Sequence, residues 1–353
     1  MQTGTSSSPA QQVPTLSVIV NNYNHERFLP DAIDSVLALD MELAEIVVVD
    51  DGSTDGSRDV IARYGDRVKP VLQANTGQLQ ACLNALAHTT GDYIYFLDAD
   101  DRVDPAFAHH VPQALAARPA KVQFRLSSLD PDGAPLPSTF PDFPKGYNTA
   151  RALRDMEVWG LYLSPPTSGN VLRRDVMERV AQTRVEYEKA IDGIALYLAP
   201  TMGELVTLDH SLGHYRLHGA NIHQQHVLSA PRLRKEVDRT TARWRHFSEL
   251  TGRPDPFVTS GPPGMVREWL MMIAVAEGRR VRFADGFAFL RQLWASSLRP
   301  KAKLLMTAWA LALLALPPRM GRTACEWRLS PLNRPKWLNK GITRTGAGAA
   351  AST

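Results

Sequence analysis

The sequence predicts an α/β fold with a mainly parallel central sheet, helices on both of its faces and a C-terminal helical region. The first observation is that apolar runs rich in Val and Ile alternate with amphipathic helical patterns between residues 16 and 97. Continuous apolar strands of this kind are typical of a parallel sheet covered on both sides. The second is that strand patterns stop near residue 230 and helical patterns follow. With 353 residues, 44% of them hydrophobic, the chain can bury one large core or two modest ones.

Each expected element has a local signal. The first strand is the apolar run LSVIV, and the helix after it opens at Pro30, because proline fits the first turn of a helix. The next strand is IVVV, and the following helix begins after the capping residues Ser53, Thr54 and Asp55. The complete series is strand 16–20, helix from 30, strand 46–49, helix after 55, strand near 68–72, helix around 79–86 and strand 93–97.

Composition divides the chain into four segments. The polar ends at 1–12 and 343–353 are expected to be disordered tails. Between them we expect an α/β domain at 13–230 and a basic helical region at 231–342. Residues 231–353 hold 22 of the 40 Lys and Arg but only 8 of the 36 Asp and Glu. Two regions of opposite charge indicate two kinds of partner.

The sequence gives no sign of export. The first residues lack an apolar signal core, and no run approaches the roughly 20 apolar residues of a spanning helix. The two cysteines, Cys82 and Cys325, lie far apart in the chain, which argues against a disulfide framework and a thiolate metal site. We therefore expect a cytoplasmic protein.

Polar clusters follow three of the predicted strands: NNYN at 21–24, DDGSTD at 50–55 and DADD at 98–101. Ligands of open α/β sheets bind beyond the carboxyl ends of the strands, so these clusters are expected to face one pocket. In Asp98-Ala99-Asp100 an extended backbone sends both acids to the same side. Such carboxylates suit Mg²⁺ or Mn²⁺ and a phosphate-bearing ligand. The alternative is an acidic turn that caps the next helix, with Asp104-Pro105 as its start.

Three segments together resemble the inverting glycosyltransferases of family 2, whose Rossmann-like fold is called GT-A. They are SVIVNNYNHERFLPDAIDSVL, IVVVDDGSTDGS and NTGQLQACLNALAHTTGDYIYFLDADD, and the resemblance covers about residues 14–220. It implies that 13–230 is a nucleotide-sugar-binding catalytic domain. It also implies a nucleotide-sugar donor, usually a UDP-sugar, a Mg²⁺ or Mn²⁺ ion on its diphosphate, and transfer with inversion.

The resemblance assigns roles to residues at the strand ends. Tyr23 resembles the aromatic residue that lies against the nucleobase, and Asp51 resembles the carboxylate that accepts a hydrogen bond from the base. Asp98 matches the acid near the ribose. Asp100 matches the metal ligand that ties the cation to both phosphates, with Asp98 beside it.

Other residues of these loops complete the expected nucleotide site. Asn21 ends the first strand, and Asn75 and Gly77 occupy the loop where the backbone approaches the donor, for which a plain turn is the alternative. For Asp101, metal contact and a helix cap stay open.

An inverting transfer needs a base for the acceptor hydroxyl. The stretch EYEKAIDGIALYLAP resembles the family segment that supplies it, which makes Asp192 the candidate. Many relatives carry a paired acid there, whereas this chain has Ile191, so Glu186 and Glu188 are the other local candidates. The alternative for Asp192 is an N-cap of the following helix.

Two further segments flank this one. PPTSGNVLRRDVMERV resembles the family's acceptor-side segment, and GHYRLHGANIH resembles a loop that folds over the donor diphosphate. Arg216 and His218 are therefore expected to stabilise the departing diphosphate. The alternative for His218 is a surface or structural histidine.

The C-terminal region predicts a membrane contact. Residues 304–316 form an apolar run with one Thr, too short to span a bilayer, and the flanking chain at 299–322 is basic. A short apolar helix with cationic ends can lie in a membrane interface, which would make the protein peripheral on the inner face of the cell membrane. The alternative is a helix buried against its neighbours. Nucleic-acid binding has no supporting motif.

The most specific function we expect is single addition of a sugar to a glycan or lipid-linked acceptor in cell-surface polysaccharide or glycoconjugate synthesis. Thr240 stands where polymerising relatives carry Gln or Arg before an Arg-Trp pair. The alternative is a non-catalytic nucleotide-sugar-binding or scaffolding protein of the same fold. A nucleotidyltransferase is disfavoured, because NNYNHERF is not a Gly-rich basic loop.

Overall fold

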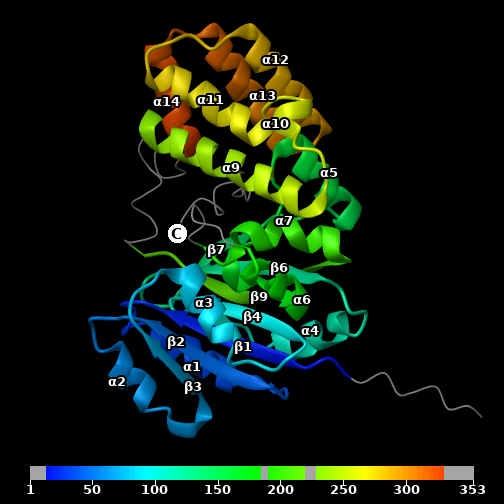
Figure 1. Ribbon diagram of the computed structural model, residues 1–353. Coiled ribbons are helices and arrows are strands. Elements are labelled where there is room, and N and C mark those ends of the chain that lie inside the picture. Colours follow the sequence, from blue (N-terminus) through cyan, green and yellow to red (C-terminus); the bar gives the residue numbers. More distant parts are fainter. Residues whose placement is uncertain (1–12, 184–189, 219–227, 330–353) are drawn as a thin grey trace, which may run out of the picture.

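The computed structural model describes residues 13–183, 190–218 and 228–329, and it confirms the predicted α/β class. A nine-stranded sheet has the order β3-β2-β1-β4-β8-β6-β9-β5, with β7 beside β6. Figure 1 shows the sheet at one end of the molecule, the helices α9 to α14 at the other, and α7 between them. Both predicted tails, Glu186 and Glu188 lie outside the described residues.

One half of the sheet is parallel, as the apolar runs predict. The strands β1, β2, β3 and β4 pair side by side in the order β3-β2-β1-β4, and all of them run in the same direction. Their carboxyl ends therefore share one edge. The elements are β1 (Leu16–Asn22), α1 (Leu29–Leu37), β2 (Glu45–Asp51), α2 (Ser57–Ala62), η1 (Gly65–Arg67), β3 (Lys69–Gln73), α3 (Gln78–Leu86) and β4 (Tyr93–Asp98).

The other half of the sheet is mixed. Strand β8 is antiparallel to β4 and β6, whereas β6 and β9 are parallel. The two-residue β5 pairs Arg102 with His214 of β9, which brings the turn after β4 against the end of β9. The elements are β5 (Arg102–Val103), α4 (Phe107–Leu115), β6 (Lys121–Leu129), β7 (Pro135–Phe140), α5 (Thr149–Trp159), η2 (Thr167–Gly169), β8 (Asn170–Arg173), α6 (Arg174–Ala181), α7 (Asp192–Met202) and β9 (Leu205–Arg216).

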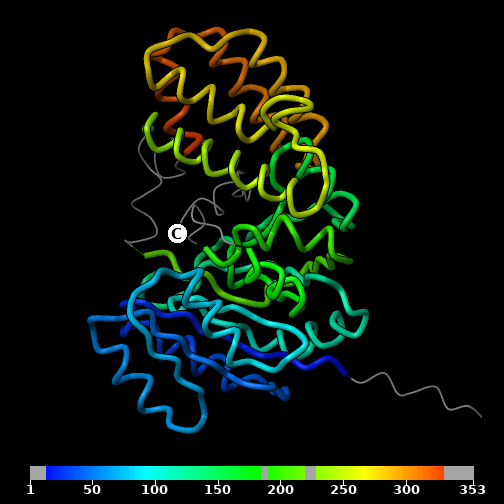
Figure 2. The backbone as a smooth tube through the Cα atoms, viewed as in Figure 1, coloured from blue at the N-terminus to red at the C-terminus, as the bar shows by residue number. Residues whose placement is uncertain are grey.

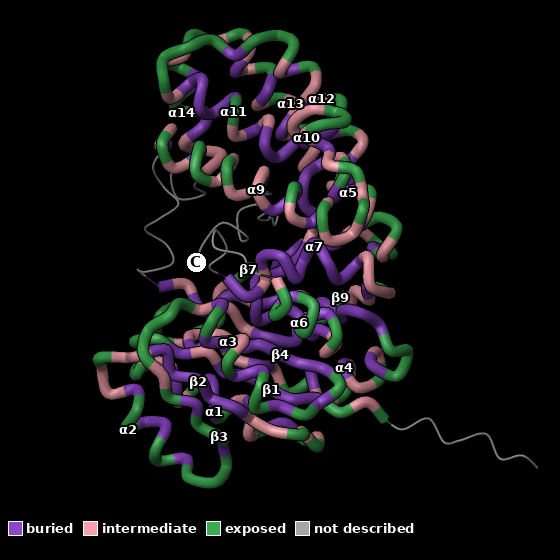
Figure 3. The backbone as a smooth tube through the Cα atoms, viewed as in Figure 1, coloured by how far each residue is buried: buried purple, intermediate pink, exposed green. Residues whose placement is uncertain are grey.

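Alternate residues of the parallel strands feed two separate cores. Val18 and Val48 pack with α1 on one face, whereas Ile19 and Val47 belong to the core on the other face. That second core continues through α7 into the C-terminal helices, as the buried segments in Figure 3 show. The helical region therefore shares a core with the sheet, and the division at residue 230 stays a prediction.

The C-terminal helices follow one another as an antiparallel stack, which can be traced along the yellow and orange tube of Figure 2. Trp244 of α9 and Tyr197 of α7 both donate a hydrogen bond to the carbonyl of Gly160, at 2.9 Å each. Their rings meet edge to face, so α9 fixes the position of α7. The helices are α9 (Ala230–Thr251), α10 (Pro256–Thr259), α11 (Gly264–Ala276), α12 (Phe283–Ala295), α13 (Pro300–Ala315) and α14 (Pro318–Leu329).

The apolar run at 304–316 forms most of α13 and satisfies neither prediction completely. Met306, Ala310 and Leu313 are buried against neighbouring helices, whereas Leu304 and Leu311 are exposed. One side of the helix is therefore core and the other side is open. In the described part of the chain, no helix combines the length and the hydropathy needed to cross a bilayer.

Candidate functional site

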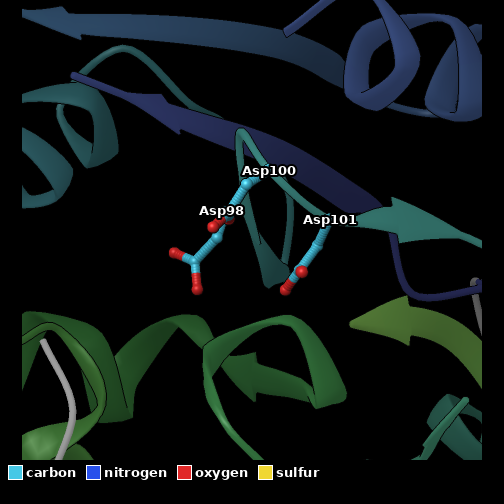
Figure 4. A group of neighbouring side chains, drawn as sticks. All are labelled: Asp98, Asp100 and Asp101. Atoms are coloured by element: carbon cyan, nitrogen blue, oxygen red, sulfur yellow. The ribbon is translucent and has the colours of Figure 1, made fainter. Parts of the chain in front are cut away.

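Three carboxylates meet at the turn between β4 and β5. Asp98, Asp100 and Asp101 each offer an oxygen, and these oxygens all lie within 4.8 Å of one another. Figure 4 shows the three side chains gathered beside the turn. Asp98 and Asp100 lie together as predicted, but a turn at Ala99 and Asp100, and not an extended backbone, brings them there. Three clustered carboxylate oxygens fit a hard divalent cation such as Mg²⁺ or Mn²⁺.

The cluster is electrostatically strained by its own charges. Burial raises the pKa of Asp98 to about 7, and the charge of Asp100 adds to this effect. Burial raises the pKa of Asp101 well above its usual range, with Asp100 and Asp98 as further causes. A carboxylate beside others of the same charge is favoured in its ionised form only when a cation offsets the repulsion. The cluster therefore has the electrostatics of a cation site.

Asp101 anchors the turn rather than capping a helix. One of its oxygens accepts from Ser168 Oγ at 2.6 Å and the other from the backbone N–H of Arg216 at 3.0 Å. Asp104 instead accepts from the backbone N–H of Ala106, just ahead of α4. The helix-cap alternative for Asp101 is therefore wrong.

The end of β9 closes over the same turn. His218 Nε2 lies 2.8 Å from a carboxylate oxygen of Asp100. Arg216 Nε donates to the backbone carbonyl of Asp100 at 2.9 Å. The structure thus brings both residues predicted for the diphosphate loop beside the predicted metal ligand, and His218 is buried rather than a surface residue.

The side chain of Arg216 is buried and bonded to several elements, which the sequence did not predict. Only 1% of the residue is exposed. Its guanidinium donates to Asp31 at 2.7 Å and to the carbonyl of Pro131 at 3.3 Å, and it lies over the ring of Phe28. Arg216 therefore ties α1, the 131 loop and the acidic turn together.

The end of β1 supports Asp98. Asn21 Nδ2 donates to Asp98 Oδ1 at 2.6 Å, and Gln78 Nε2, at the start of α3, donates to the same oxygen at 3.0 Å. Tyr23 follows with 45% of the residue exposed. Asn21 and Tyr23 thus lie at the edge that carries the acidic turn. Sequence reasoning missed Gln78, because a single Gln at a helix start carries no distinctive signal.

Asp51 organises the loop that carries Asn75 and Gly77. Its carboxylate accepts from Gln73 Nε2 and from the backbone N–H groups of Thr76 and Gly77, each at 2.8 Å. Gly77 has φ +89°, a conformation that favours glycine. The structure therefore ties Gly77 directly to Asp51 and places Asn75 in the same loop.

Asp50, the first acid of the DDGS segment, is a structural residue. Its buried carboxylate accepts from Asn22 at 2.9 Å and from Arg58 at 2.8 Å. Burial acts to raise its pKa, but hydrogen bonds from Ser53, Arg58 and Asn22 bring the pKa below its usual value. Asp50 thus links β1, β2 and α2.

Asp192 is the first residue of α7, and its charge contributes to the raised pKa of Asp98. The acidic turn and the predicted base therefore lie on facing elements. The N-cap position is Ile191 and Asp192 is the first helical residue, so the N-cap alternative for Asp192 is wrong. A carboxylate in the first turn is nevertheless favoured by the helix dipole.

A buried polar network behind the site was not predicted. Lys121 of β6 is fully buried and donates to Tyr162 Oη at 2.9 Å and to Ser164 Oγ at 2.8 Å. Asn170 holds the same loop through the carbonyls of Pro165 and Pro166. The network positions η2, whose Ser168 binds Asp101. A lysine within the apolar run AKVQF was the signal that could have revealed it.

The fold and this site define a class of protein. A mixed α/β sheet with an acidic turn after its fourth strand is the arrangement of glycosyltransferases with the GT-A fold, and solved GT-A structures superpose on nearly the whole chain. Residues 17–180 match the model of the family described as Glycosyl transferase family 2. The chain belongs to this family through that domain.

One relative and two solved structures illustrate the similarity. An uncharacterized glycosyltransferase of Nostoc sp. is 37% identical over 214 residues, which are 59% of this chain and 66% of the relative. The S. aureus TarS 1–349 structure with UDP-GlcNAc has a TM-score of 0.54 at 15% identity, covering 89% of this chain and 91% of that one. The Pyrobaculum calidifontis mannosyltransferase with GDP-Man and Mn²⁺ has a TM-score of 0.50 at 20% identity, covering 93% and 89%.

The similarity to the curated relatives is partial. The chain spans 66%, 34% and 51% of the lengths of the first three. The solved structures, at 15% and 20% identity, establish the shared fold.

Proposed function

We propose that this protein is an inverting, metal-dependent glycosyltransferase that adds a single sugar from a nucleoside-diphosphate donor, a UDP-sugar by preference, to a glycan or lipid-linked acceptor. The observation that carries the proposal is the cluster of Asp98, Asp100 and Asp101 within 4.8 Å of one another, with Asp192 at the start of the facing helix. The pathway we propose is cell-surface polysaccharide or glycoconjugate synthesis.

Asp100 and Asp98 are the residues that would hold Mg²⁺ or Mn²⁺. When bound there, the ion would offset the charge of the donor diphosphate. The raised pKa of Asp98 fits this role, because it reflects negative charge that is unfavourable in the cluster and that a bound cation would offset. The mannosyltransferase that shares the fold was solved with GDP-Man and Mn²⁺.

The nucleotide would lie at the ends of β1, β2 and β3. Exposed Tyr23 offers an aromatic face to the base, and Asp51, which accepts from the backbone N–H groups of Thr76 and Gly77, lies at the same edge. Asn21 orients Asp98 toward the ribose through the 2.6 Å hydrogen bond. The residues that hold the donor are thus fixed to the sheet and to one another before a ligand arrives.

Asp192 would take the proton from the acceptor hydroxyl as it attacks the anomeric carbon on the face opposite the leaving diphosphate, which inverts the configuration there. The start of α7 suits this role, since the helix dipole favours the ionised carboxylate before it accepts the proton. A positioned base supplies roughly 10² to 10⁴ in rate. The remainder must come from orientation of the two substrates and from charge stabilisation of the leaving group.

His218 and Arg216 would act at the diphosphate. His218 lies against Asp100, so its imidazole would stand beside the diphosphate of a donor bound at the cation site. Arg216 holds the backbone of the acidic turn, so it would place the metal ligands and add positive charge behind them. Both roles require the end of β9 to stay closed over the turn.

The location that suits a lipid-linked acceptor is the cytoplasm, with the protein peripheral on the inner face of the cell membrane. Its support is the exposed side of α13, where Leu304 and Leu311 lie open. A nucleotide-sugar donor from the cytoplasm and an acceptor at the membrane would then meet on one protein.

The test is donor turnover by the full chain. UDP-GlcNAc, UDP-glucose and GDP-mannose are incubated with Mn²⁺ or with EDTA, and release of nucleoside diphosphate is followed. We expect slow release from at least one donor with Mn²⁺ and none with EDTA. The exposed Asp66, near the opposite ends of the parallel strands, gives a control in Asp66→Asn, which should be as active as the wild type.

The stereochemistry is tested separately. With an acceptor that supports transfer, the anomeric configuration of the product is read by NMR. An inverted linkage supports the proposal. Retention of the donor configuration contradicts the inverting mechanism. Tight nucleotide-sugar binding without turnover under any acceptor contradicts the enzymatic function and favours the binding protein.

A further inference from the structure

Helix α13 is apolar on a side that the described chain leaves open. Leu304, Ala308, Leu311 and Ala315 are exposed and recur at intervals of three and four residues, so they form one stripe along the helix. Exposure is 60% for Leu304 and 52% for Leu311. A helix that is apolar all round is normally buried on all sides. This stripe therefore needs a partner.

Helix α12 carries a second stripe, made of aromatic residues. Phe283 and Phe287 are each 68% exposed and Trp294 is 51% exposed. Their spacing of four and seven residues places them on one face. Aromatic side chains of this size contribute most of the apolar area in the interfaces where they are buried.

The two stripes form one surface, which we call the α12–α13 face. Trp294 Nε1 donates to Thr307 Oγ1 at 3.1 Å, and Thr307 lies one turn from both Leu304 and Leu311. At the other end of α12, Gly286 packs against Leu314 so closely that an added Cβ would approach it to 2.7 Å. Figure 1 shows the two helices side by side at the end of the molecule away from the sheet.

The α12–α13 face is bordered by positive charge. Exposed basic residues lie within or beside the stripes, and Asp285 is the single acid in the sequence from 279 to 322, against nine Lys and Arg. Arg291 stands between Phe287 and Trp294, and Lys301 lies one turn before Leu304. The exposed basic residues are Arg282, Arg291, Arg299, Lys301, Arg319 and Arg322.

Apolar centre and basic border together select one partner. A second copy of this chain docked face to face would bring two sets of positive charges together, which is unfavourable. A bilayer with anionic headgroups offers acyl chains to the aromatic residues and negative charge to Arg and Lys. The complementarity of charge therefore favours the membrane.

We propose that the α12–α13 face binds the surface of bilayers that contain anionic lipids, with Phe283, Phe287 and Trp294 entering the interface and the basic residues contacting headgroups. The inference moves the contact from the segment 299–322 alone to a surface shared with α12. It rests on the proposed function in one respect, since a lipid-linked acceptor is the reason for such an enzyme to hold a membrane.

The test is co-sedimentation of the full chain with vesicles of phosphatidylcholine alone or mixed with phosphatidylglycerol. We expect binding at least about tenfold stronger to the mixed vesicles, and weaker binding as NaCl is raised. The double variant Phe283→Ser, Phe287→Ser should bind at least about tenfold more weakly than the wild type. The matched control Leu72→Ser, Val258→Ser removes exposed apolar residues elsewhere and should bind as the wild type does.

Three outcomes overturn the proposal: no binding to the mixed vesicles, equal binding by the double variant and the wild type, or a dimer in light scattering that the double variant loses without any vesicle binding. The same variants are titrated with UDP and Mn²⁺ by thermal shift. A double variant that loses vesicle binding but still binds UDP shows that the substitutions affect the membrane contact and leave the nucleotide site intact. A wild-type chain that binds vesicles but neither UDP nor GDP contradicts the proposed function and leaves the membrane proposal standing.

Discussion

The acidic turn after β4 and the α12–α13 face lie on different parts of the molecule. Charged side chains are normally exposed and large apolar ones buried, and the two regions reverse this rule in opposite ways. At the turn, Asp98 and Asp101 bring like charges into a buried place, which raises their pKa values. On the face, Phe283 and Phe287 leave apolar area in water. Both arrangements cost stability in the isolated chain, and our two proposals assign each cost to a ligand that would offset it.

The two regions should respond independently to change. A variant at the turn should lose catalysis or cation binding and keep vesicle binding, and a variant on the face should do the reverse.

The largest effect is expected for Asp192→Asn. Without the base, turnover should fall by roughly 10² to 10⁴. Binding of UDP or GDP with Mn²⁺ should change little, since the acid turn is intact. Steady-state release of nucleoside diphosphate measures the first and calorimetry the second; wild-type turnover in the variant would remove Asp192 from the mechanism.

Asp100→Asn should impair both steps. The substitution replaces a negatively charged carboxylate, the proposed metal ligand, by a neutral amide. We therefore expect the Mn²⁺-dependent affinity for the nucleotide to fall by about tenfold or more, and turnover to fall by orders of magnitude. Vesicle binding serves as the control and should stay at the wild-type level. A variant that binds UDP equally well with and without Mn²⁺, as tightly as the wild type, would contradict the assigned role.

The pKa of Asp98 predicts a pH-dependent stability in the absence of cation. The unfolded carboxyl loses its proton near pH 3.8, whereas the folded one keeps it to about pH 7, so the folded chain loses relative stability as pH rises through this window. In EDTA, Asp98→Asn should therefore raise the Tm more at pH 8 than at pH 5. Thermal unfolding at both pH values measures this, and an equal shift at both would show that the carboxyl does not titrate there.

The smallest effect is expected in the loop that Asp51 organises. Gly52 has φ +77°, and an added Cβ would lie 2.5 Å from the backbone nitrogen of Asn75. Gly52→Ala should cost about 1 to 3 kcal/mol in the free energy of unfolding. Gly65 also has positive φ but open space around it, so Gly65→Ala should cost less.

Urea unfolding of the two alanine variants separates the contact from the backbone strain. If the two lose the same stability, the approach of Asn75 to Gly52 contributes nothing, and the loop is held by Asp51 alone.

The parallel half of the sheet and the acidic turn were accessible from the sequence because their signals are local. LSVIV, IVVV and YIYFLD are typical of buried strands, and the acids of DADD follow the last of them directly, although a turn and not an extended backbone brings Asp98 and Asp100 together. Parallel strands share one edge for their carboxyl ends, so Asn21, Asp51 and Asp98 could be assigned to one site.

The remainder depends on contacts between residues far apart in the chain. The two-residue β5 has no periodicity to detect, yet its pairing with β9 places His218 on Asp100. The partners of Arg216 and Lys121 lie far from them in the sequence, and no local pattern predicts these contacts. The exposed aromatic stripe of α12 could not be predicted for a different reason. The spacing of apolar residues does not show which face of a helix is covered by the rest of the protein.

The most direct test of the acidic turn is calorimetric titration of the full chain with UDP and with GDP, in Mn²⁺ and in EDTA. We expect binding of at least one nucleotide in Mn²⁺, with the heat abolished by EDTA and strongly reduced in Asp100→Asn. No heat for either nucleotide in Mn²⁺, or equal affinity in EDTA, would show that Asp98 and Asp100 do not join a cation to a diphosphate.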